Sequence, residues 1–190
     1  MAQAAANGQL FGPFGEEPVL LVIDVQNGVV ANAWDRDGVL ERLAALIDRA
    51  RTDGVPVVYV QHESDDRVPG TDPWRIHERI APRDGEPVIA KRYGDAFVET
   101  TLARTLEQLE AGHLYIAGAQ TDACIRSTVH RAMGIGYDVA LVSDCHTTDD
   151  FDWDGVKLSA EQIVGHLNLA IRYSEYPGQV IRAIPHTEIH

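Results

Sequence analysis

Hydrophobic residues occur along the chain in two patterns that alternate with each other. The first is a short unbroken run, which is typical of a parallel strand covered on both faces. Such runs predict strands at residues 19–23, 55–60, 87–90, 114–117, 137–142 and 179–184. The second is a spacing of three or four residues, which predicts amphipathic helices at residues 38–50, 102–109, 125–133 and 163–171. This alternation predicts an α/β fold, a three-layer sandwich whose six-stranded, mainly parallel sheet has helices on both faces.

Two polar stretches interrupt these patterns. Residues 61–86 carry Asp, Arg, Pro and Gly around isolated apolar positions, and a stretch of that length usually serves as a lid or an oligomer contact. Residues 149–154 form an acidic loop. This loop is either a solvated surface or a device that attracts a cationic substrate to a nearby cleft. We expect the loops at residues 61–86 and 143–157 to determine substrate specificity.

Length and composition favour a single soluble domain. A chain of 190 residues can bury one sizeable core, so we expect a short mobile leader at residues 1–18 and one domain at residues 19–190. The leader lacks the features of a signal peptide, and no apolar run approaches a membrane span. The net charge of −13 disfavours nucleic acid and anionic membranes as partners. Only Cys124 and Cys145 are present, which favours a reducing compartment and a cytoplasmic location.

Three chemically capable residues follow the carboxyl ends of three different predicted strands. They are Asp24, Lys91 and Cys124, and ligands of parallel sheets bind in a crevice at that edge. Cys124 falls in a first helical turn, capped by Thr121 or Asp122, where free backbone N–H groups lower a thiol's pKa. Asp24 is then a base for the thiol, and Lys91 a cation that pairs with Asp24. Singly, each has an ordinary alternative: Asp24 as a loop cap, Lys91 as a surface lysine and Cys124 as a structural cysteine.

Several motifs, in this order, resemble the isochorismatase-like cysteine hydrolases over nearly the whole chain. The matching segments are residues 21–27, 88–97, 118–124, 136–148 and 160–164. The resemblance implies a triad of Asp24, Lys91 and Cys124 and the strand order 3-2-1-4-5-6. It also implies a cis peptide bond between Ala119 and Gln120, with the backbone N–H groups of Gln120 and Cys124 forming an oxyanion hole. A homodimer or homotetramer is expected.

The remaining candidates concern the substrate pocket and a metal. The pocket candidates are Gln26, His62, Trp74, Tyr93, His146 and Thr147. By the same resemblance, the nicotinamidase branch of the superfamily has an Asp-x-His metal motif after its second strand. Residues 60–63 of this chain lack that Asp. His62, Glu63 and His77 could still bind a metal, although their spacing is not that of a tight site. We expect no metal and no cofactor.

The function predicted from these observations is that of a cysteine amidohydrolase. Its substrate would be a small non-peptide amide, carbamoyl compound or lactam, and its C–N bond would be cleaved through a thioester intermediate. A family branch that hydrolyses the lactam of the cationic antibiotic streptothricin makes a cationic substrate reasonable. The isochorismatases that cleave vinyl ethers lack the cysteine, so Cys124 points away from that reaction. A metal-dependent nicotinamidase and a non-catalytic binding or assembly domain remain as alternatives.

Overall fold

A six-stranded parallel sheet forms the centre of the computed structural model, which describes residues 15–189. Most of the predicted leader, residues 1–14, lies outside the described residues. The strands of this sheet are β1 (Glu17–Ile23), β2 (Val57–His62), β3 (Val88–Lys91), β4 (Ala111–Ala119), β5 (Asp138–Thr147) and β8 (Ile181–Ile184). Their order is β3-β2-β1-β4-β5-β8, and all neighbours pair in parallel. The predicted sheet is confirmed, except that its sixth strand is the eighth along the chain.

The two strands missing from the prediction form a separate hairpin. They are β6 (Phe151–Trp153) and β7 (Val156–Leu158), which pair only with each other, so residues 149–154 are not simply a loop. The turn between them contains Asp154 and Gly155, both with positive φ. An Asp-Gly pair between apolar residues at alternating positions favours such a two-residue turn. The sequence therefore contained a hairpin signal, but the acidic composition of the segment favoured a loop interpretation.

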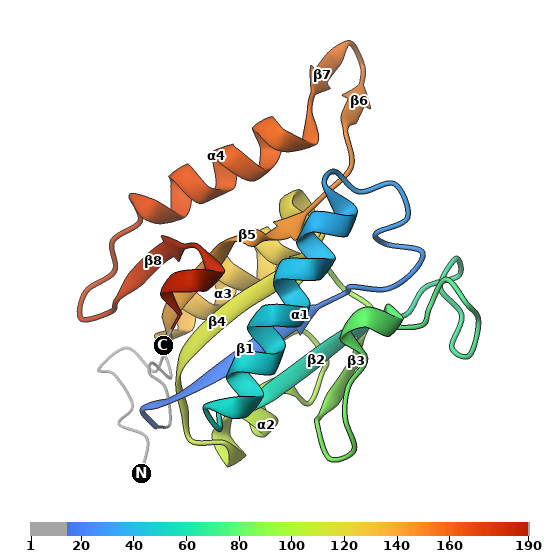
Figure 1. The fold of residues 1–190 in the computed structure, drawn as a ribbon. Coiled ribbons are helices and arrows are strands. Elements are labelled where there is room, and N and C mark those ends of the chain that lie inside the picture. The colour runs from blue at the N-terminus through green and yellow to red at the C-terminus, as the bar shows by residue number, and fades with distance from the viewer. Residues whose placement is uncertain (1–14, 190) are drawn as a thin grey trace.

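Helices cover both faces of the sheet, as the alternating pattern predicts. They are α1 (Arg36–Thr52), α2 (Leu102–Gln108), α3 (Arg126–Ile135) and α4 (Ala160–Arg172). Helix α1 lies in front of the sheet in Figure 1, and α2 and α3 lie behind it. Two hydrophobic cores result, one between the sheet and α1 and one between the sheet and the other helices. A capping box of Ser159 and Gln162, which the sequence pattern Ser-x-x-Gln before an apolar helix predicts, begins α4.

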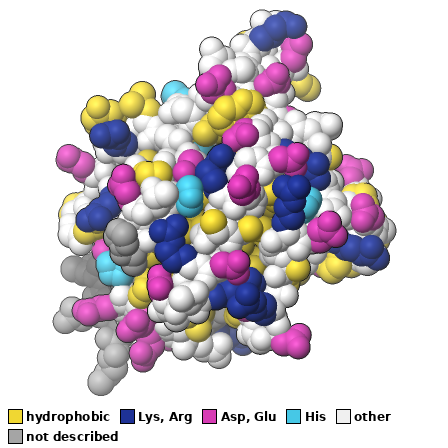
Figure 2. Space-filling model, in the orientation of Figure 1, with side chains coloured by type: hydrophobic (Ala, Val, Ile, Leu, Met, Phe, Trp, Pro, Cys, Tyr) yellow, Lys and Arg dark blue, Asp and Glu magenta, His cyan; other side chains and the backbone are white. Residues whose placement is uncertain are grey.

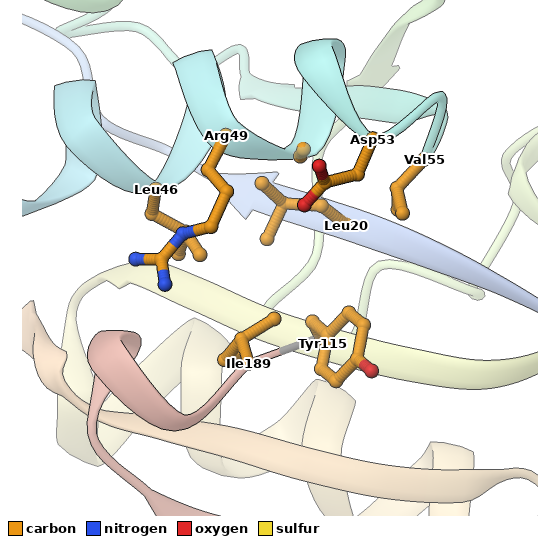
Figure 3. A pocket seen from close by; sticks show the side chains of 8 residues that line it. Leu20, Leu46, Arg49, Asp53, Val55, Tyr115 and Ile189 are labelled. Atoms are coloured by element: carbon orange, nitrogen blue, oxygen red, sulfur yellow. The ribbon is translucent and has the colours of Figure 1, made fainter.

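The face covered by α1 also receives the C-terminal segment. Ile189 is buried in the same core as α1, beside a small pocket between α1, β1 and β4 (Figure 3). This pocket is lined by Leu20, Leu46, Arg49, Ala50, Asp53, Val55, Tyr115 and Ile189. It contains none of the residues that the sequence predicts for catalysis, so we interpret it as a packing feature.

The surface shows charges of both signs. In Figure 2, acidic and basic side chains are interspersed over the visible face rather than separated into fields. Among residues 15–189, no helix is long and apolar enough to cross a membrane.

Candidate active site

The sheet brings the three predicted catalytic side chains together. Asp24 directly follows β1, Lys91 is the last residue of β3, and Cys124 lies in a π-type turn, Thr121–Ile125, between β4 and α3. Lys91 Nζ is 2.6 Å from Asp24 Oδ2 and 3.1 Å from Cys124 Sγ. The prediction that residues after three different strands come together is therefore correct in geometry.

Lys91 is the centre of this cluster. Only 2% of Lys91 and 1% of Asp24 is exposed, so the ion pair lies in the interior. The ammonium group also donates to His62 Nδ1 at 3.0 Å and to the Tyr93 carbonyl at 3.1 Å. Lys91 thus has four hydrogen-bond acceptors within reach but only three N–H groups to donate. Its ammonium group can therefore shift between the carboxylate and the sulfur without leaving the site.

Burial sets the proton affinities of the cluster. It raises the pKa of Asp24 above the ordinary value of 3.8, although the charge of Lys91 opposes this. Burial, followed by the negative charge of Asp24, also raises the pKa of the Cys124 thiol to about 11. The prediction that a helix N-terminus lowers this pKa is wrong here, because desolvation of the thiolate outweighs it. The resting thiol is neutral at pH 7 and needs a base, and Asp24 lies beside it.

The turn that carries Cys124 depends on the backbone of β4. Gly118 has a φ of 127°, and a Cβ there would overlap the carbonyl oxygen of Ile23. The peptide bond between Ala119 and Gln120 is cis, as the family resemblance implies. The predicted side-chain cap is wrong, since the Thr121 hydroxyl bonds His146 and Asp122 accepts from Thr148. The Gln120 and Cys124 N–H groups stay predicted oxyanion donors.

His62 is held by the same lysine. Because Lys91 donates to Nδ1, the ring's proton is on Nε2. Burial, with the charges of Lys91 and Arg67, lowers the pKa of His62 to about 4, so the ring is neutral at pH 7. Ligand atoms of Asp24, His62 and Cys124 lie within 4.8 Å of one another, which is also a metal-like grouping. The Lys91 ammonium contacts all three residues and thereby supplies the positive charge of this cluster.

Glu63 and His77, the other metal candidates, lie apart from this group. Among residues 15–189, only two sets of potential ligands come within 4.8 Å of one another, and neither contains Glu63 or His77. His77 instead caps a short helix, accepting from the backbone N–H of Arg79, and contacts Arg36. The ligand set suggested by the sequence is therefore not assembled.

Gln26 and Trp74 position the site. Gln26 is fully buried, its Oε1 accepts from the His62 N–H, and its Nε2 donates to the carbonyls of His62 and Trp74. Gln61 donates to the same Trp74 carbonyl. The Gln26 amide has no free group for a substrate. It joins the ends of β1 and β2 to the polar stretch of residues 61–86, which carries Trp74. The Trp74 indole nitrogen is buried and has no hydrogen-bond partner among the described residues.

The other pocket candidates divide into engaged and accessible residues. His146 is buried, with Nδ1 bonded to Thr121 and Nε2 to Asn168, and the Thr147 hydroxyl donates to the Trp34 carbonyl. Both side chains are buried and hydrogen-bonded within the protein, which favours positioning roles over contact with a substrate. Tyr93 is 48% exposed and lies two residues after Lys91. It stays a candidate for the entrance of the site.

Two further charged residues lie near the cluster: sequence reasoning missed Arg67, but it placed Asp149 in the acidic loop that was expected to overhang the site. The charge of Arg67 lowers the pKa values of both His62 and Asp24, and its Nε is buried without a hydrogen-bond partner among the described residues. Asp149 accepts from the Gln120 side chain at 3.0 Å through Oδ2, while Oδ1 is buried without such a partner. Arg67 lies in a polar stretch whose charges look alike in sequence, so only its folded position distinguishes it.

Two other carboxylates of the acidic segment have structural partners. Asp150 accepts from the backbone N–H of Ala160 at the start of α4, and Asp152 pairs with Lys157 across the hairpin at 2.8 Å. Among the described residues, neither forms a hydrogen bond or ion pair with the Cys124 turn. Of the four carboxylates expected to overhang the site, Asp149 is the one shown to reach it.

Comparison with known proteins shows the family of the chain. The isochorismatase domain model matches residues 18–167. The chain belongs to the isochorismatase family. A streptothricin hydrolase of Streptomyces noursei is 33% identical over 137 residues, which cover 69% of this chain and 50% of that protein. A maleamate amidohydrolase of Pseudomonas putida is 32% identical over 161 residues, covering 73% of this chain and 75% of that one.

Structural similarity extends over most of the described chain. The crystal structure of an isochorismatase from Pseudomonas putida KT2440 superimposes with a TM-score of 0.82 at 26% identity, covering 92% of this chain and 90% of that chain. The fold is therefore that of the isochorismatase family. The match spans about half the length of the first-named relative, the streptothricin hydrolase.

Proposed function

We propose that this member of the isochorismatase family is a cysteine amidohydrolase that cleaves the C–N bond of a small non-peptide amide, carbamoyl compound or lactam. The observation that carries the proposal is the buried Lys91 ammonium, which contacts both the Asp24 carboxylate and the Cys124 sulfur. A nucleophile, a base and a cation that orients them are the parts that covalent catalysis on a carbonyl requires. Relatives named as a maleamate amidohydrolase and an N-carbamoylsarcosine amidase support this class of reaction.

In the first half of the reaction, Asp24 takes the proton of Cys124 as the sulfur attacks the substrate carbonyl. The S–C bond forms, and the carbonyl electrons move to the oxygen, which the backbone N–H groups of Gln120 and Cys124 stabilise. The C–N bond then breaks, and Asp24 returns the proton to the departing nitrogen. The products of this step are a thioester on Cys124 and ammonia or an amine.

In the second half, water hydrolyses the thioester. Asp24 takes a proton from the water as the oxygen attacks, and the C–S bond breaks. The proton returns to sulfur, which releases a carboxylic acid and restores the thiol. The Lys91 ammonium group, which contacts both Asp24 and Cys124, stabilises whichever partner is anionic. A buried Asp24 with a raised pKa suits this role, because a stronger base shares the proton more evenly with a weakly acidic thiol.

A panel of amides tests the proposal. We would incubate the purified chain with maleamate, an N-carbamoyl amino acid, nicotinamide and a streptothricin-type lactam, and measure release of ammonia or amine. Mass spectrometry would detect an acyl adduct, and hydroxylamine would trap it as a hydroxamate. We expect turnover and an adduct confined to Cys124, and loss of both in Cys124→Ala.

The same experiment separates the alternatives. Activity lost on treatment with a chelator and restored by a divalent cation would indicate the metal-dependent nicotinamidase. Turnover of an amide that survives Cys124→Ala would exclude the thioester route. No turnover and no adduct across the panel, in a protein that is folded, would favour a binding or assembly domain.

A further inference from the structure

A second cluster of potential metal ligands is formed by other residues than the catalytic group. It consists of Asp144 and Cys145, near the end of β5, and His186, in a short helix (His186–Glu188) that follows β8. One ligand atom of each residue lies within 4.8 Å of the ligand atoms of the other two. The fold therefore brings a carboxylate, a thiol and an imidazole together from two segments that are distant in the chain.

Asp144 joins the other two members of this second cluster. Its Oδ1 accepts from the backbone N–H of His186 at 2.8 Å, and its Oδ2 lies 2.7 Å from His186 Nδ1. The negative charge of the same carboxylate acts on the neighbouring Cys145 thiol. Cys145 is fully buried, so its sulfur is held in place by the packing around it. The three ligand groups thus already face one another before any ion binds.

The two clusters differ in their source of positive charge. In the catalytic group, the Lys91 ammonium contacts all three potential ligands. In the second cluster, the ion pair found for Asp144 among residues 15–189 is with His186, which is charged only when it is protonated. No lysine or arginine of the described chain forms an ion pair with this carboxylate. A bound cation would supply the charge that Lys91 supplies in the catalytic group.

Two arginines of α1 lie near the second cluster. Arg42 pairs with Asp35 at 2.6 Å, and its Nε donates to the backbone carbonyl of Asp144 rather than to the carboxylate. The charges of Arg42 and Arg49 favour ionisation of the Cys145 thiol, and the thiolate is the form of cysteine that binds metals. The same charges repel a cation. Binding therefore depends on the two negative charges of the ionised carboxylate and thiolate, which a divalent ion neutralises.

The ligand types identify the ion. Sulfur, imidazole nitrogen and carboxylate oxygen together are typical of Zn²⁺, whereas Mg²⁺ and Ca²⁺ take oxygen ligands. Zn²⁺ bonds of about 2.0–2.3 Å place tetrahedral ligand atoms roughly 3.5 Å apart. That spacing lies between the 2.7 Å of the Asp144–His186 contact and the 4.8 Å limit of the cluster. The side chains of Asp144 and His186 are 31% and 18% exposed, so an ion can reach the cluster from solvent.

We propose that Asp144, Cys145 and His186 bind one Zn²⁺ ion. The ion takes the place of the hydrogen between Asp144 Oδ2 and His186 Nδ1, the neutral imidazole carries its proton on Nε2, and the thiol releases its proton to solvent. With three protein ligands, water fills the fourth position. His186 belongs to the C-terminal segment, whose Ile189 packs in the core with α1. The ion would therefore fasten this segment to β5, and the proposal is independent of the catalytic function.

Zinc binding to the full chain tests the proposal. After chelator treatment, equilibrium dialysis against micromolar Zn²⁺ should give one bound ion per chain, and Co²⁺ in its place should give thiolate-to-metal absorption. Cys145→Ser and His186→Gln should each weaken binding about 100-fold or more, since loss even of groups that only orient zinc ligands costs about 10–100-fold. Zn²⁺ should raise the Tm of the wild type but not of these variants. His186→Gln changes a partly exposed side chain, so it keeps the test valid if Cys145→Ser does not fold.

Two control variants separate this cluster from other potential ligands. Cys124→Ser removes the thiol of the catalytic group, and it should keep both the zinc and the cobalt absorption. His113→Gln alters another His–Asp pair, with Asp138 at 3.1 Å, which belongs to neither cluster, and it should keep both as well. A wild type that binds no zinc, binding that survives Cys145→Ser and His186→Gln, or binding lost in Cys124→Ser would each overturn the proposal. None of these measurements requires amide turnover, so their failure would leave the proposed function untouched.

Discussion

The two cysteines differ in what surrounds them. Cys145 is fully buried, and burial raises its pKa far above the ordinary value, whereas Cys124 is partly exposed and lies beside a base and a cation. Iodoacetamide at neutral pH should therefore modify Cys124 first, which peptide mapping would show. Cys145→Ala should keep most of the activity, and Cys124→Ser should lose it. Equal labelling of the two thiols would contradict the assignment.

Substitutions of Asp24 and Lys91 should shift the pKa of the Cys124 thiol in opposite directions. The charge of Asp24 raises the pKa of Cys124 and that of Lys91 lowers it. Asp24→Asn should lower the thiol pKa below about 11 and Lys91→Met should raise it, as the pH dependence of alkylation would show. Both variants should lose about 10²–10⁴-fold in turnover, because Asp24→Asn removes the base and Lys91→Met removes the cation that stabilises the anionic partner. An Asp24→Asn enzyme with normal turnover would remove Asp24 from the mechanism.

Arg67 and Asp149 place opposite charges near the site. Arg67 acts electrostatically on both His62 and Asp24, whereas one Asp149 oxygen is already bonded to Gln120. We therefore expect Arg67→Gln to raise KM for acid-bearing amides such as maleamate, with little change in kcat. Asp149→Asn should raise KM only for cationic amides. Equal KM changes for both substrate charges in either variant would show that these residues act on the fold and not on the substrate.

At the scale of elements, close approach of β4 to β1 creates the site. Gly118 needs both its positive φ and its missing Cβ, because the Ile23 carbonyl lies against it. Gly118→Ala should lower the unfolding free energy by about 1–3 kcal/mol and also abolish turnover. Gly134→Ala is the matched control, since nothing lies within 4 Å of its added Cβ in α3. It should stabilise the protein by about 0.5–1 kcal/mol.

The sequence could predict elements whose signals are local in the chain, but not contacts between segments that are distant in the chain. The α1 stripe and the capping box of Ser159 and Gln162 arise from local spacing, and both were predicted. The β6–β7 hairpin also has a local signal in Asp154 and Gly155, but its charges favoured a loop interpretation. The absent side-chain cap before Cys124 was not predictable, because His146, on another strand, takes the Thr121 hydroxyl.

For the molecule as a whole, His146 should make stability depend on pH. Burial lowers its pKa to about 4, so between pH 6.5 and 4 the unfolded chain binds a proton that the folded chain excludes. The unfolding free energy therefore falls as the pH falls through this window, by up to about 1.4 kcal/mol per pH unit. In His146→Gln, whose amide can keep both hydrogen bonds, urea titrations should show a shallower fall. An unchanged pH dependence would mean that His146 binds a proton as readily in the folded protein as in the unfolded chain.

The sequence by itself determined the α/β fold, the order along the chain of the six sheet strands and the four α-helices, and the residues that end the strands. Hydrophobic period and strand ends are local properties, and parallel strands place their carboxyl ends at one edge, so Asp24, Lys91 and Cys124 could be grouped from sequence. Only the tertiary structure decided the proton affinities of these groups, the engagement of Gln26 and His146, and the nearness of Arg67. Desolvation and charge coupling depend on which distant segments pack together, and no local pattern of residues records that.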